Sequence, residues 1–412
     1  MAPRIILLHY TAPPVVGGVE SVVGTQARLL RQAGHEVWVV AGRGRHGAGC
    51  MLVPLLYGRH PEVRAAHAAL RRGDAGPVQE VGQRVADELA ELLSGSVCVV
   101  HNAFTMAKNL PLLWALHRLV DRALGCRWVA WTHDVVWDNP QELARVPEGP
   151  FRALLRTARP EVTYVAITET VRASLVRHLG LPQAAVTVIP PGTSLDALQV
   201  LGSQARRVLE ALSWDAYDPV LLVPVRVTRR KNLELAVGVA AALRARGRRP
   251  LVVVTGPLGA HNPANARYLA ELQALRESLG VEEHVVFLAE RGVRCSPRTV
   301  GQLYLACDGV LLTSTWEGFG LPVAEAGLLR VPVFCSRIPA LREVAGEDAH
   351  FFGREETPEA VADLVLRALS EDRASRLRRR VRDNFGWERL VRERLVPLLN
   401  ELAKAGGAPT PE

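Results

Sequence analysis

The sequence has few lysines, few aromatic residues and no long apolar run. Only Lys108, Lys231 and Lys404 stand among its 50 basic residues, so the formal net charge of +8 comes from 47 arginines. No stretch approaches the roughly 20 apolar residues of a membrane-spanning helix, and Met1-Ala2-Pro3-Arg4 leads into a strand pattern rather than a signal-peptide core. Basic runs interleaved with aromatics and zinc-finger spacings are missing as well, so we expect no nucleic-acid partner.

Cysteines are few and scattered, and no Cys-x-x-Cys pair occurs. The six lie at Cys50, Cys98, Cys126, Cys295, Cys307 and Cys335. This spacing excludes a disulfide framework and a typical zinc site, and it indicates small core residues in a reducing compartment. We therefore predict a cytoplasmic protein. No Asp-x-Asp element stands in a suitable loop, which favours chemistry without a metal.

The length of 412 residues and the 48% apolar composition indicate a globular protein with two domains. Strand and helix patterns alternate twice, which predicts an α/β fold of two doubly wound Rossmann-like domains that face a cleft. The Pro190-Pro191-Gly192 cluster separates them. We predict domains over 1–192 and 193–384, followed by a C-terminal helical segment over 385–412.

The expected strands and helices follow the same rhythm in both halves. In the first half, strands are expected at 4–9, 35–40, 97–101, 127–132, 162–167 and 186–189, and helices at 19–33, 59–72, 78–93, 106–124 and 168–179, with Thr168 as a helix cap. In the second half, strands are expected at 220–225, 251–255, 284–288, 310–312 and 331–335, and helices at 233–246, 263–279, 299–307, 322–329 and 358–369.

Two glutamates, Glu317 and Glu325, flank a Gly318-Phe319-Gly320 bend that follows an apolar strand. Pro322 opens the next helix, because proline at a first helical position loses no hydrogen bond. Glycines let backbone amides approach a ligand, and a helix start attracts negative charge. An ordinary turn with a glutamate placed to complement the helix dipole is the plainer alternative. The combination favours a sugar that carries a diphosphate.

Arg226 and Lys231 stand five positions apart, between a strand and a helix. A guanidinium and an ammonium at this place can clamp a diphosphate, the first as a fork and the second as a point charge. Lysine is rare in this chain, so Lys231 is the more informative residue. Arg229 and Arg230 are predicted to lie in solvent, because arginine runs are common in this composition.

These motifs resemble family 4 of the retaining glycosyltransferases, which have the GT-B fold. The family's Glu-x7-Glu block matches Glu317 to Glu325, and its Arg-x4-Lys element matches Arg226 and Lys231. Gly17-Gly18-Val19-Glu20 is similar to its amino-terminal glycine loop, and His133 falls where the family has a histidine that faces the donor sugar. The terminal helix after Trp387 resembles the segment that crosses back to the first domain.

The resemblance implies that the first domain binds the acceptor and the second the nucleotide sugar, and it implies a role for each matching residue. The predicted catalytic residues are Arg226, Lys231, Glu317 and His133. The predicted donor-binding residues are Gly17, Gly18, Gly318, Phe319, Gly320, Leu321 and Glu325, with Glu325 holding the ribose and the base pocket beginning at 287–291. We predict acceptor contacts at Tyr10, His101 and Asn102, which lie at the carboxyl ends of strands of the first domain. The sequence departs from the family where Gly-Asp-Gly-Pro is often found: it has Thr255-Gly256-Pro257-Leu258-Gly259, followed by an unusual insert at 260–263.

The predicted activity is therefore that of a metal-independent hexosyltransferase. It moves glucose or mannose, with retention, from a nucleoside-diphosphate sugar (UDP-glucose or GDP-mannose) to a hydroxyl of a small polar acceptor, and it requires no cofactor. A lipid-linked or glycan acceptor at a membrane face is an alternative, although membrane contact is not favoured, because the apolar side of the helix at 59–72 is mostly alanine. An epimerase or phosphorylase of the same fold, a non-enzymatic sugar-nucleotide sensor and a homo-oligomer also stay open.

Overall fold

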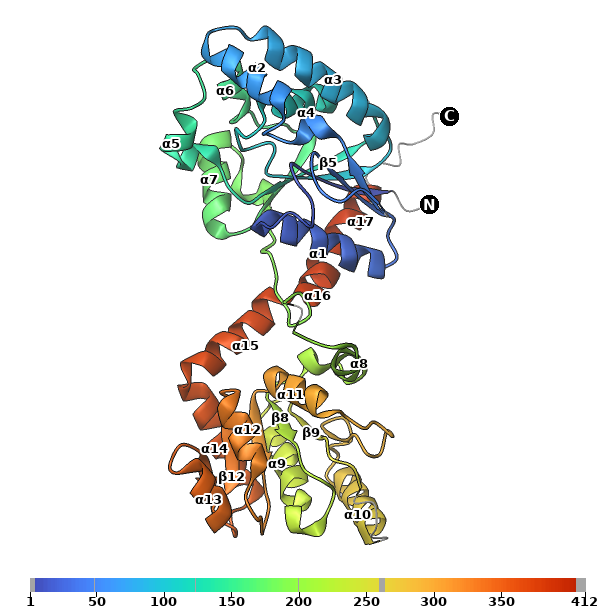
Figure 1. Cartoon of the computed structure of the whole chain (residues 1–412), viewed down its shortest axis with the longest axis vertical. Coiled ribbons are helices and arrows are strands. Elements are labelled where there is room, and N and C mark those ends of the chain that lie inside the picture. The colour runs from blue at the N-terminus through green and yellow to red at the C-terminus, as the bar shows by residue number, and fades with distance from the viewer. Residues whose placement is uncertain (1–3, 48, 123, 199, 259–263, 405–412) are drawn as a thin grey trace. The chain divides into compact units, whose positions relative to one another are not determined.

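The computed structural model describes residues 4–47, 49–122, 124–198, 200–258 and 264–404. The chain divides into two compact units, coloured in Figure 1 along the sequence. Unit 1 contains the residues up to Thr193 and those from Asn384 onward, and unit 2 contains Ser194–Asp383. The roles predicted for the two domains, in acceptor and donor binding, stay predictions.

Unit 1 contains a seven-stranded parallel sheet in the order β3-β2-β1-β4-β5-β6-β7. Its strands are β1 Ile5–His9, β2 Val37–Ala41, β3 Cys50–Leu52, β4 Val97–His101, β5 Arg127–Thr132, β6 Val162–Ala166 and β7 Val186–Val188. The central strands are continuous apolar runs, because both faces of a parallel sheet are covered by helices. Figure 1 shows α2 Pro61–Arg71, α3 Gly76–Leu93 and α4 Leu110–Asp121 on one side and α1 Gly18–Gln32 on the other. The shorter helices α5 Pro140–Leu143 and α6 Pro150–Leu154 precede α7 Glu169–Leu179.

The end of the chain returns to unit 1. After α15 Arg373–Phe385, it continues through α16 Trp387–Leu390, a π-helical turn at Val391–Leu395 and α17 Val396–Lys404. Trp387 is buried, and its backbone nitrogen donates to the carbonyl of Thr193 at 3.4 Å. A Cβ on Gly192 would lie 2.8 Å from the Trp387 ring, so this close approach requires glycine at position 192. The predicted C-terminal helix that crosses back to the first domain is confirmed.

Unit 2 contains a six-stranded parallel sheet in the order β10-β9-β8-β11-β12-β13. Its strands are β8 Val220–Val223, β9 Leu251–Val254, β10 Val285–Phe287, β11 Gly309–Leu312, β12 Val333–Ser336 and β13 His350–Phe352. Its helices are α8 Ser203–Ala211, α9 Leu233–Ala245, α10 Ala264–Ser278, α11 Pro297–Ala306, α12 Leu321–Leu328, α13 Pro339–Ala345 and α14 Pro358–Glu371. Both sheets have the strand order of a Rossmann fold, which confirms the predicted fold class.

The arginines of α15 attach this helix to unit 2. Arg382 donates to Asp218 at 2.8 Å and to Asp308 at 3.0 Å, and Arg379 reaches Asp218 at 3.1 Å. Asp308 also accepts from the backbone nitrogen of Val220 at 2.8 Å. The two aspartates therefore join α15 to the amino ends of β8 and β11. Some of the chain's many arginines thus contribute to the fold.

Most predicted elements are confirmed within a few residues, and Thr168 caps α7 by accepting from Val171 at 3.1 Å. Six of the described strands and α-helices were not predicted: β3, α5, α6, α8, α13 and β13. The two strands are three-residue edge strands, too short for a clear apolar pattern. The helix predicted over 106–124 begins only at Leu110, because the Asn109 side chain accepts from the nitrogen of Leu112. The insert at 260–263 lies outside the described residues. Among those described, no helix is both long and apolar enough to cross a membrane.

We predict that acid destabilises unit 1 partly through His117 on α4. Burial, together with the charge of Arg159, lowers the pKa of His117 from 6.5 to about 4. Because the pKa of His117 is higher in the unfolded chain, the unfolded chain binds a proton first as the pH falls below 6.5. The free energy of unfolding therefore decreases between pH 6.5 and 4. At about pH 5 this residue alone lowers it by about 2 kcal/mol. Urea titrations across this range should show a shallower pH slope for His117→Phe. An unchanged slope, or the same flattening by His46→Phe at an exposed loop, would contradict the assignment.

Candidate functional site

In each sheet the order in which successive strands are added reverses once, between two neighbouring strands, and we call this place the switch point. The predicted site residues lie near the two switch points. In unit 2, β8 lies beside β11, with Leu222 opposite Val310. In unit 1, β1 lies beside β4, with Leu7 opposite Val99. In open α/β sheets, ligands bind beyond the carboxyl ends of such neighbouring strands, where the loops diverge.

Lys231 and Glu317 form a nearly buried ion pair at the carboxyl ends of β8 and β11. Lys231 lies in a short helical turn, Arg229–Lys231, and its ammonium donates to Glu317 Oε1. Only 9% of the Lys231 side chain and 10% of the Glu317 side chain are exposed. Ser314 Oγ also donates to Glu317 Oε1, at 2.7 Å. The sequence predicted both residues as catalytic, and the structure brings them into direct contact.

Burial and pairing act in opposite directions on these two groups. Burial lowers the pKa of the Lys231 ammonium, and the hydrogen bond to Glu317 partly offsets this. Burial alone would raise the pKa of Glu317, but hydrogen bonds from Lys231 and Ser314 and the Lys231 charge hold it below its ordinary value. The carboxylate is therefore ionised at neutral pH and already organised by donors.

Backbone contacts hold the two loops together. Thr313 Oγ1 donates to the carbonyl of Lys231 at 2.7 Å, and the nitrogen of Thr315 donates to the carbonyl of Arg230 at 2.9 Å. These bonds join segments that lie more than 80 residues apart in the sequence. The backbone that carries Lys231 is thus held against the loop that follows β11.

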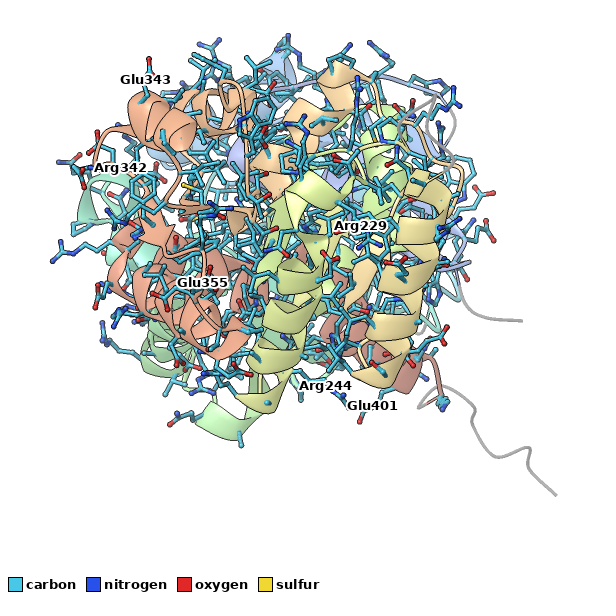
Figure 2. All side chains as sticks on the ribbon, turned by 90° about the horizontal axis from the view of Figure 1, so that it is seen from below. Arg229, Arg244, Arg342, Glu343, Glu355 and Glu401 are labelled. Atoms are coloured by element: carbon cyan, nitrogen blue, oxygen red, sulfur yellow. The ribbon has the colours of Figure 1, made fainter. Side chains whose placement is uncertain are left out.

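Arg229 and Arg230 are exposed, as predicted, but both also form ion pairs. Arg230 Nη1 donates to Glu317 Oε2 at 3.2 Å, which gives this carboxylate a second cation. Arg229, labelled in Figure 2, pairs with Glu271 on α10, and its guanidinium lies over the Tyr268 ring. Arg226 is exposed, and its charge contributes to lowering the pKa of Lys231, which places it near the pair.

The bend after Glu317 requires glycine at one position. Gly320 has a φ of +100°, and a Cβ there would lie 2.5 Å from Leu341 Cδ2. It caps α12, where Phe319 and Leu321 expose 57% and 63% of their surface. Gly318 faces open space. The amides and apolar side chains of this bend are therefore accessible to a ligand.

Glu325 lies in the second half of the predicted block, on the exposed side of α12. Tyr304 on α11 donates its hydroxyl to Glu325 Oε2 at 2.7 Å, and Tyr304 itself is 1% exposed. The carboxylate is thus oriented by a buried partner that the sequence analysis did not identify. Its remaining oxygen can accept from ligand hydroxyls.

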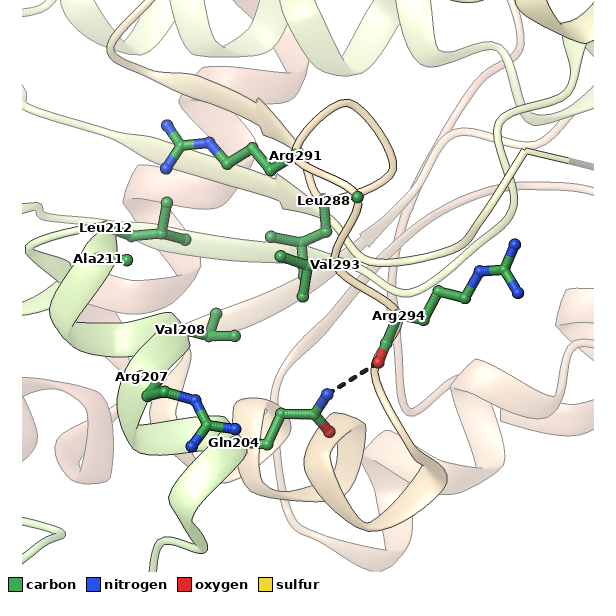
Figure 3. A pocket seen from close by; sticks show the side chains of 10 residues that line it. Gln204, Arg207, Val208, Ala211, Leu212, Leu288, Arg291, Val293 and Arg294 are labelled. Atoms are coloured by element: carbon green, nitrogen blue, oxygen red, sulfur yellow. Dashed lines mark hydrogen bonds between the residues drawn. The ribbon is translucent and has the colours of Figure 1, made fainter.

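A pocket of about 370 Å³ opens beside the loop that follows β10 (Figure 3). Apolar side chains and three arginines line it, together with Gln204: Val208, Leu212, Leu288, Val293, Arg207, Arg291 and Arg294. Gln204 on α8 donates to the carbonyl of Arg294 at 2.8 Å and holds the loop against the helix. The predicted base pocket at 287–291 adjoins this cavity.

Three histidines meet at the switch point of unit 1. His101 Nδ1 lies 3.1 Å from His133 Nε2, and His9 Nδ1 donates to the carbonyl of His101 at 3.0 Å. His101 Nε2 is buried without a hydrogen-bond partner in the part of the chain that the structure describes. A buried N–H without a hydrogen-bond partner is rare, so we assign the His101 proton to Nδ1, which donates to His133 Nε2. The proton of the neutral His133 ring then lies on Nδ1.

Burial keeps these imidazoles neutral. Burial lowers the pKa of His133 to about 4, with a smaller contribution from the neighbouring His9, and burial lowers the pKa of His101 well below its ordinary value. His133 is 8% exposed, whereas His101 is fully buried. His133 can therefore offer a neutral N–H donor to a ligand, and His101 lies behind it as its hydrogen-bond partner.

Asn102 fixes the loop that carries His133. Its side-chain oxygen accepts from the backbone nitrogens of His133 and Asp134 at 2.7 and 3.0 Å, and its amide donates to Asp134 Oδ2 at 3.1 Å. Asn102 has a φ of +61°, a left-handed conformation that is uncommon outside glycine. The third predicted acceptor residue, Tyr10, is also buried, with its hydroxyl 3.5 Å from the Met106 carbonyl. The predicted acceptor contacts of Tyr10, His101 and Asn102 stay predictions.

The glycine loop of unit 1 precedes α1. Gly17 caps this helix without a side-chain hydrogen bond, and Gly18 faces open space. A Cβ on Gly17 would collide with the Glu20 carboxylate, which accepts from Thr11 and lies 3.9 Å from His9 Nε2. The free amides at the start of α1 can therefore bind an anion.

We predict that Asn102 acts through the backbone of the His133 loop. Asn102→Ala removes two bonds to backbone N–H groups, of which the His133 N–H is buried. It also places a residue with a Cβ and no polar side chain in a left-handed conformation. Together these changes should lower the free energy of unfolding by about 3 kcal/mol. Asn102→Gly should lose about 1 kcal/mol less, because only the hydrogen bonds are lost. Urea denaturation measures both. Equal losses would show that backbone strain plays no part.

Comparison with known proteins gives two family matches. Residues 207–385 match the family described as glycosyl transferases group 1, and residues 16–197 match glycosyltransferase family 4. A D-inositol 3-phosphate glycosyltransferase of Xylanimonas cellulosilytica is 32% identical over 54% of this chain and 53% of its own length. One from Geodermatophilus obscurus is 28% identical over 72% of this chain and 60% of its own. The chain thus spans little more than half the length of these relatives.

A solved structure of sucrose-phosphate synthase from Thermosynechococcus elongatus aligns with 98% of this chain at 18% identity, with a TM-score of 0.40, which is too low to support an argument about function. The family matches are stronger, because together they cover both units and contain the Arg226, Lys231 and Glu317 motifs. The chain belongs to the group 1/family 4 glycosyltransferases and has their GT-B fold.

Proposed function

We propose that this protein is a retaining hexosyltransferase that uses a nucleoside-diphosphate sugar and a hydroxyl-bearing acceptor. The observation that carries the proposal is the ion pair of Lys231 and Glu317 at the β8/β11 switch point, with Arg226 and Arg230 close by. Cations at this place can bind the diphosphate, and the carboxylate can accept from sugar hydroxyls. A nearly buried ion pair with perturbed pKa values, at the place where open α/β sheets bind ligands, supports a binding site.

The transfer breaks the bond between the anomeric carbon and the diphosphate oxygen and forms a bond to the acceptor oxygen. The acceptor proton passes to the leaving diphosphate, so atoms and charge balance without another reactant. Negative charge grows on the diphosphate as the bond breaks, and Lys231 and Arg226 would stabilise it. Lys231 suits this role because its ammonium can shift from Glu317 to a phosphate oxygen by rotating its side chain.

The glycine bend and the pocket of unit 2 support the placement of the donor. The amides at 318–321 would hold the sugar, Glu325 the ribose and the cavity beside β10 the base. Neighbouring strands lie about 5 Å apart, so the exits of β8 and β10 are about 10 Å apart, comparable to the reach of a nucleoside. Leu288 and Val293 offer apolar contact to the base, and the Arg291 guanidinium can stack on it.

The residues of the site constrain the identity of the hexose and of the acceptor less than they constrain the position of the donor. Several relatives are D-inositol 3-phosphate glycosyltransferases, and a sucrose synthase of Acidithiobacillus caldus is 28% identical over 48% of this chain. We infer UDP-glucose or GDP-mannose as donor and a small polar acceptor. Incubation with labelled donor separates the alternatives: an epimerase changes the donor sugar without an acceptor, and a sensor leaves it intact. Slow donor hydrolysis supports the transferase.

Lys231→Ala is expected to reduce turnover about 100-fold or more, because it removes a cation from the leaving group. The KM for the acceptor should change little. Arg342→Ala serves as a control, because it removes an arginine of unit 2 whose partner Glu347 lies at the surface. Steady-state kinetics with saturating donor measure the effect. Unchanged turnover in a folded Lys231→Ala protein would refute the assignment.

Tyr304→Phe is expected to weaken nucleotide binding about fivefold, since the loss of one hydrogen bond of about 1 kcal/mol frees the Glu325 carboxylate. Calorimetric titration with UDP and GDP measures the change in Kd. Tyr217→Phe, which alters a buried tyrosine at the amino end of β8, should bind the nucleotide like the wild type. Equal weakening by both replacements would indicate a general packing effect instead.

A further inference from the structure

Unit 1 contains a second pocket, of about 200 Å³, beside the loop that follows β4. The C-terminal half of α2, the start of α4 and the segment around α5 form its walls. Its lining residues with charged or ionisable side chains are His67, Arg71, Lys108, Glu142 and Arg145. This volume is below the range of about 300–1,000 Å³ that holds a whole drug-sized ligand, so the pocket fits one part of a larger molecule.

Three cations of this pocket have no ion-pair partner in the part of the chain that the structure describes. Arg71, Lys108 and Arg145 are exposed, and none forms an ion pair with another residue that the structure describes. Many arginines of unit 1 are paired: Arg84 with Glu62, Arg122 with Asp87 and Arg159 with Asp121. Lys108 is also one of only three lysines in the chain. Glu142 offsets one charge, so the lining keeps an excess of about two positive charges.

The walls that carry these cations are rigid. His67 Nε2 accepts from the backbone nitrogen of Leu110 at 3.0 Å, which fixes the imidazole against the start of α4. The buried Asn109 side chain donates to the carbonyls of Leu55 and Leu56 at 2.8 and 3.1 Å. Burial and the charge of Arg71 lower the pKa of His67 to about 4, so this ring is neutral. The pocket is therefore preformed and not assembled by mobile side chains alone.

The loop that follows β4 connects the pocket with the histidine cluster of the same unit. It begins after His101, and Lys108 of this loop lines the pocket. Between them, Thr105 Oγ1 donates to the carbonyl of Asp134 at 2.8 Å, next to His133. The pocket and the cluster therefore share one loop of unit 1.

We propose that this pocket binds a phosphate group of the acceptor, with Arg71, Lys108 and Arg145 as its cationic contacts and Glu142 accepting from a neighbouring hydroxyl. The inference rests on the proposed function, because it assigns the acceptor class of that activity: a hydroxyl-bearing phosphate ester. Arginines bind phosphate as planar forks and lysine as a point charge, so the lining can satisfy several phosphate oxygens at once. The same chemistry fits a soluble sugar phosphate and a phospholipid headgroup.

Binding of glucose 6-phosphate and of glucose, measured by calorimetric titration on the full chain, tests the proposal. The wild type should bind the phosphate ester and bind glucose at least tenfold more weakly. Arg71→Ala, Lys108→Ala and Arg145→Ala should each weaken binding of the ester about five- to tenfold, the scale of one charge-assisted hydrogen bond at an open site. Arg64→Ala, on the exposed side of the same helix α2, is the matched control and should bind like the wild type.

Vesicles of phosphatidylglycerol and phosphatidylcholine distinguish the source of the phosphate. Co-sedimentation that depends on Arg71, Lys108 and Arg145, with weak binding of glucose 6-phosphate, would assign a lipid-linked acceptor to the same pocket. Binding of neither probe, or equal binding by the variants and the wild type, would overturn the proposal. Thermal midpoints within the range of the Arg64→Ala control exclude misfolding as the cause.

Donor hydrolysis keeps this test separate from the proposed function. The pocket variants should hydrolyse the nucleotide sugar at the wild-type rate in the absence of acceptor, because the donor residues of unit 2 are intact. Loss of phosphate binding with normal donor hydrolysis supports the acceptor assignment. Phosphate binding by a wild type that never hydrolyses or binds any donor would instead refute the transferase and leave only an anion site.

Discussion

The buried contact between Lys231 and Glu317 is the interaction on which the donor site depends. Removing both charges from water is costly, and only close pairing with further hydrogen bonds offsets that cost. Ser314 and Arg230 supply these bonds to the carboxylate. Such a pair is a poor source of stability compared with apolar packing, so its position beyond β8 and β11 favours a role in binding. A diphosphate would replace the carboxylate as a partner of the lysine.

Unit 1 also has two energetically costly features beyond the carboxyl ends of its strands. Asn102 adopts a left-handed conformation, and His101 buries a ring nitrogen without a hydrogen-bond partner among the described residues. Strained backbone and unsatisfied polar atoms persist mainly where a function requires them. Here both residues contact His133: Asn102 accepts from its backbone nitrogen, and His101 bonds to its ring. The two units thus build their polar sites at equivalent places in equivalent sheets.

The sequence predicted the strands, the helices and the residue types of the candidate site, but not the contacts between those residues. Buried parallel strands are continuous apolar runs, so β1 and β9 were evident, whereas the short edge strands β3 and β13 were not. Lys231 and Glu317 were predicted by residue type and spacing. Their pairing was not, because it depends on β8 lying beside β11, more than 80 residues away. The contacts of Arg230 with Glu317, of Tyr304 with Glu325 and of His101 with His133 were not predicted either, because they also arise only in the folded chain.

A crystal structure of the protein with a bound nucleoside diphosphate tests the central claim most directly. The account predicts that the Lys231 ammonium and the Arg226 guanidinium lie within hydrogen-bonding distance of the diphosphate, that Glu325 accepts from the ribose and that the base lies beside the β10 loop. A nucleotide bound elsewhere, with Lys231 still held by Glu317 and Arg226 pointing into solvent, would contradict it.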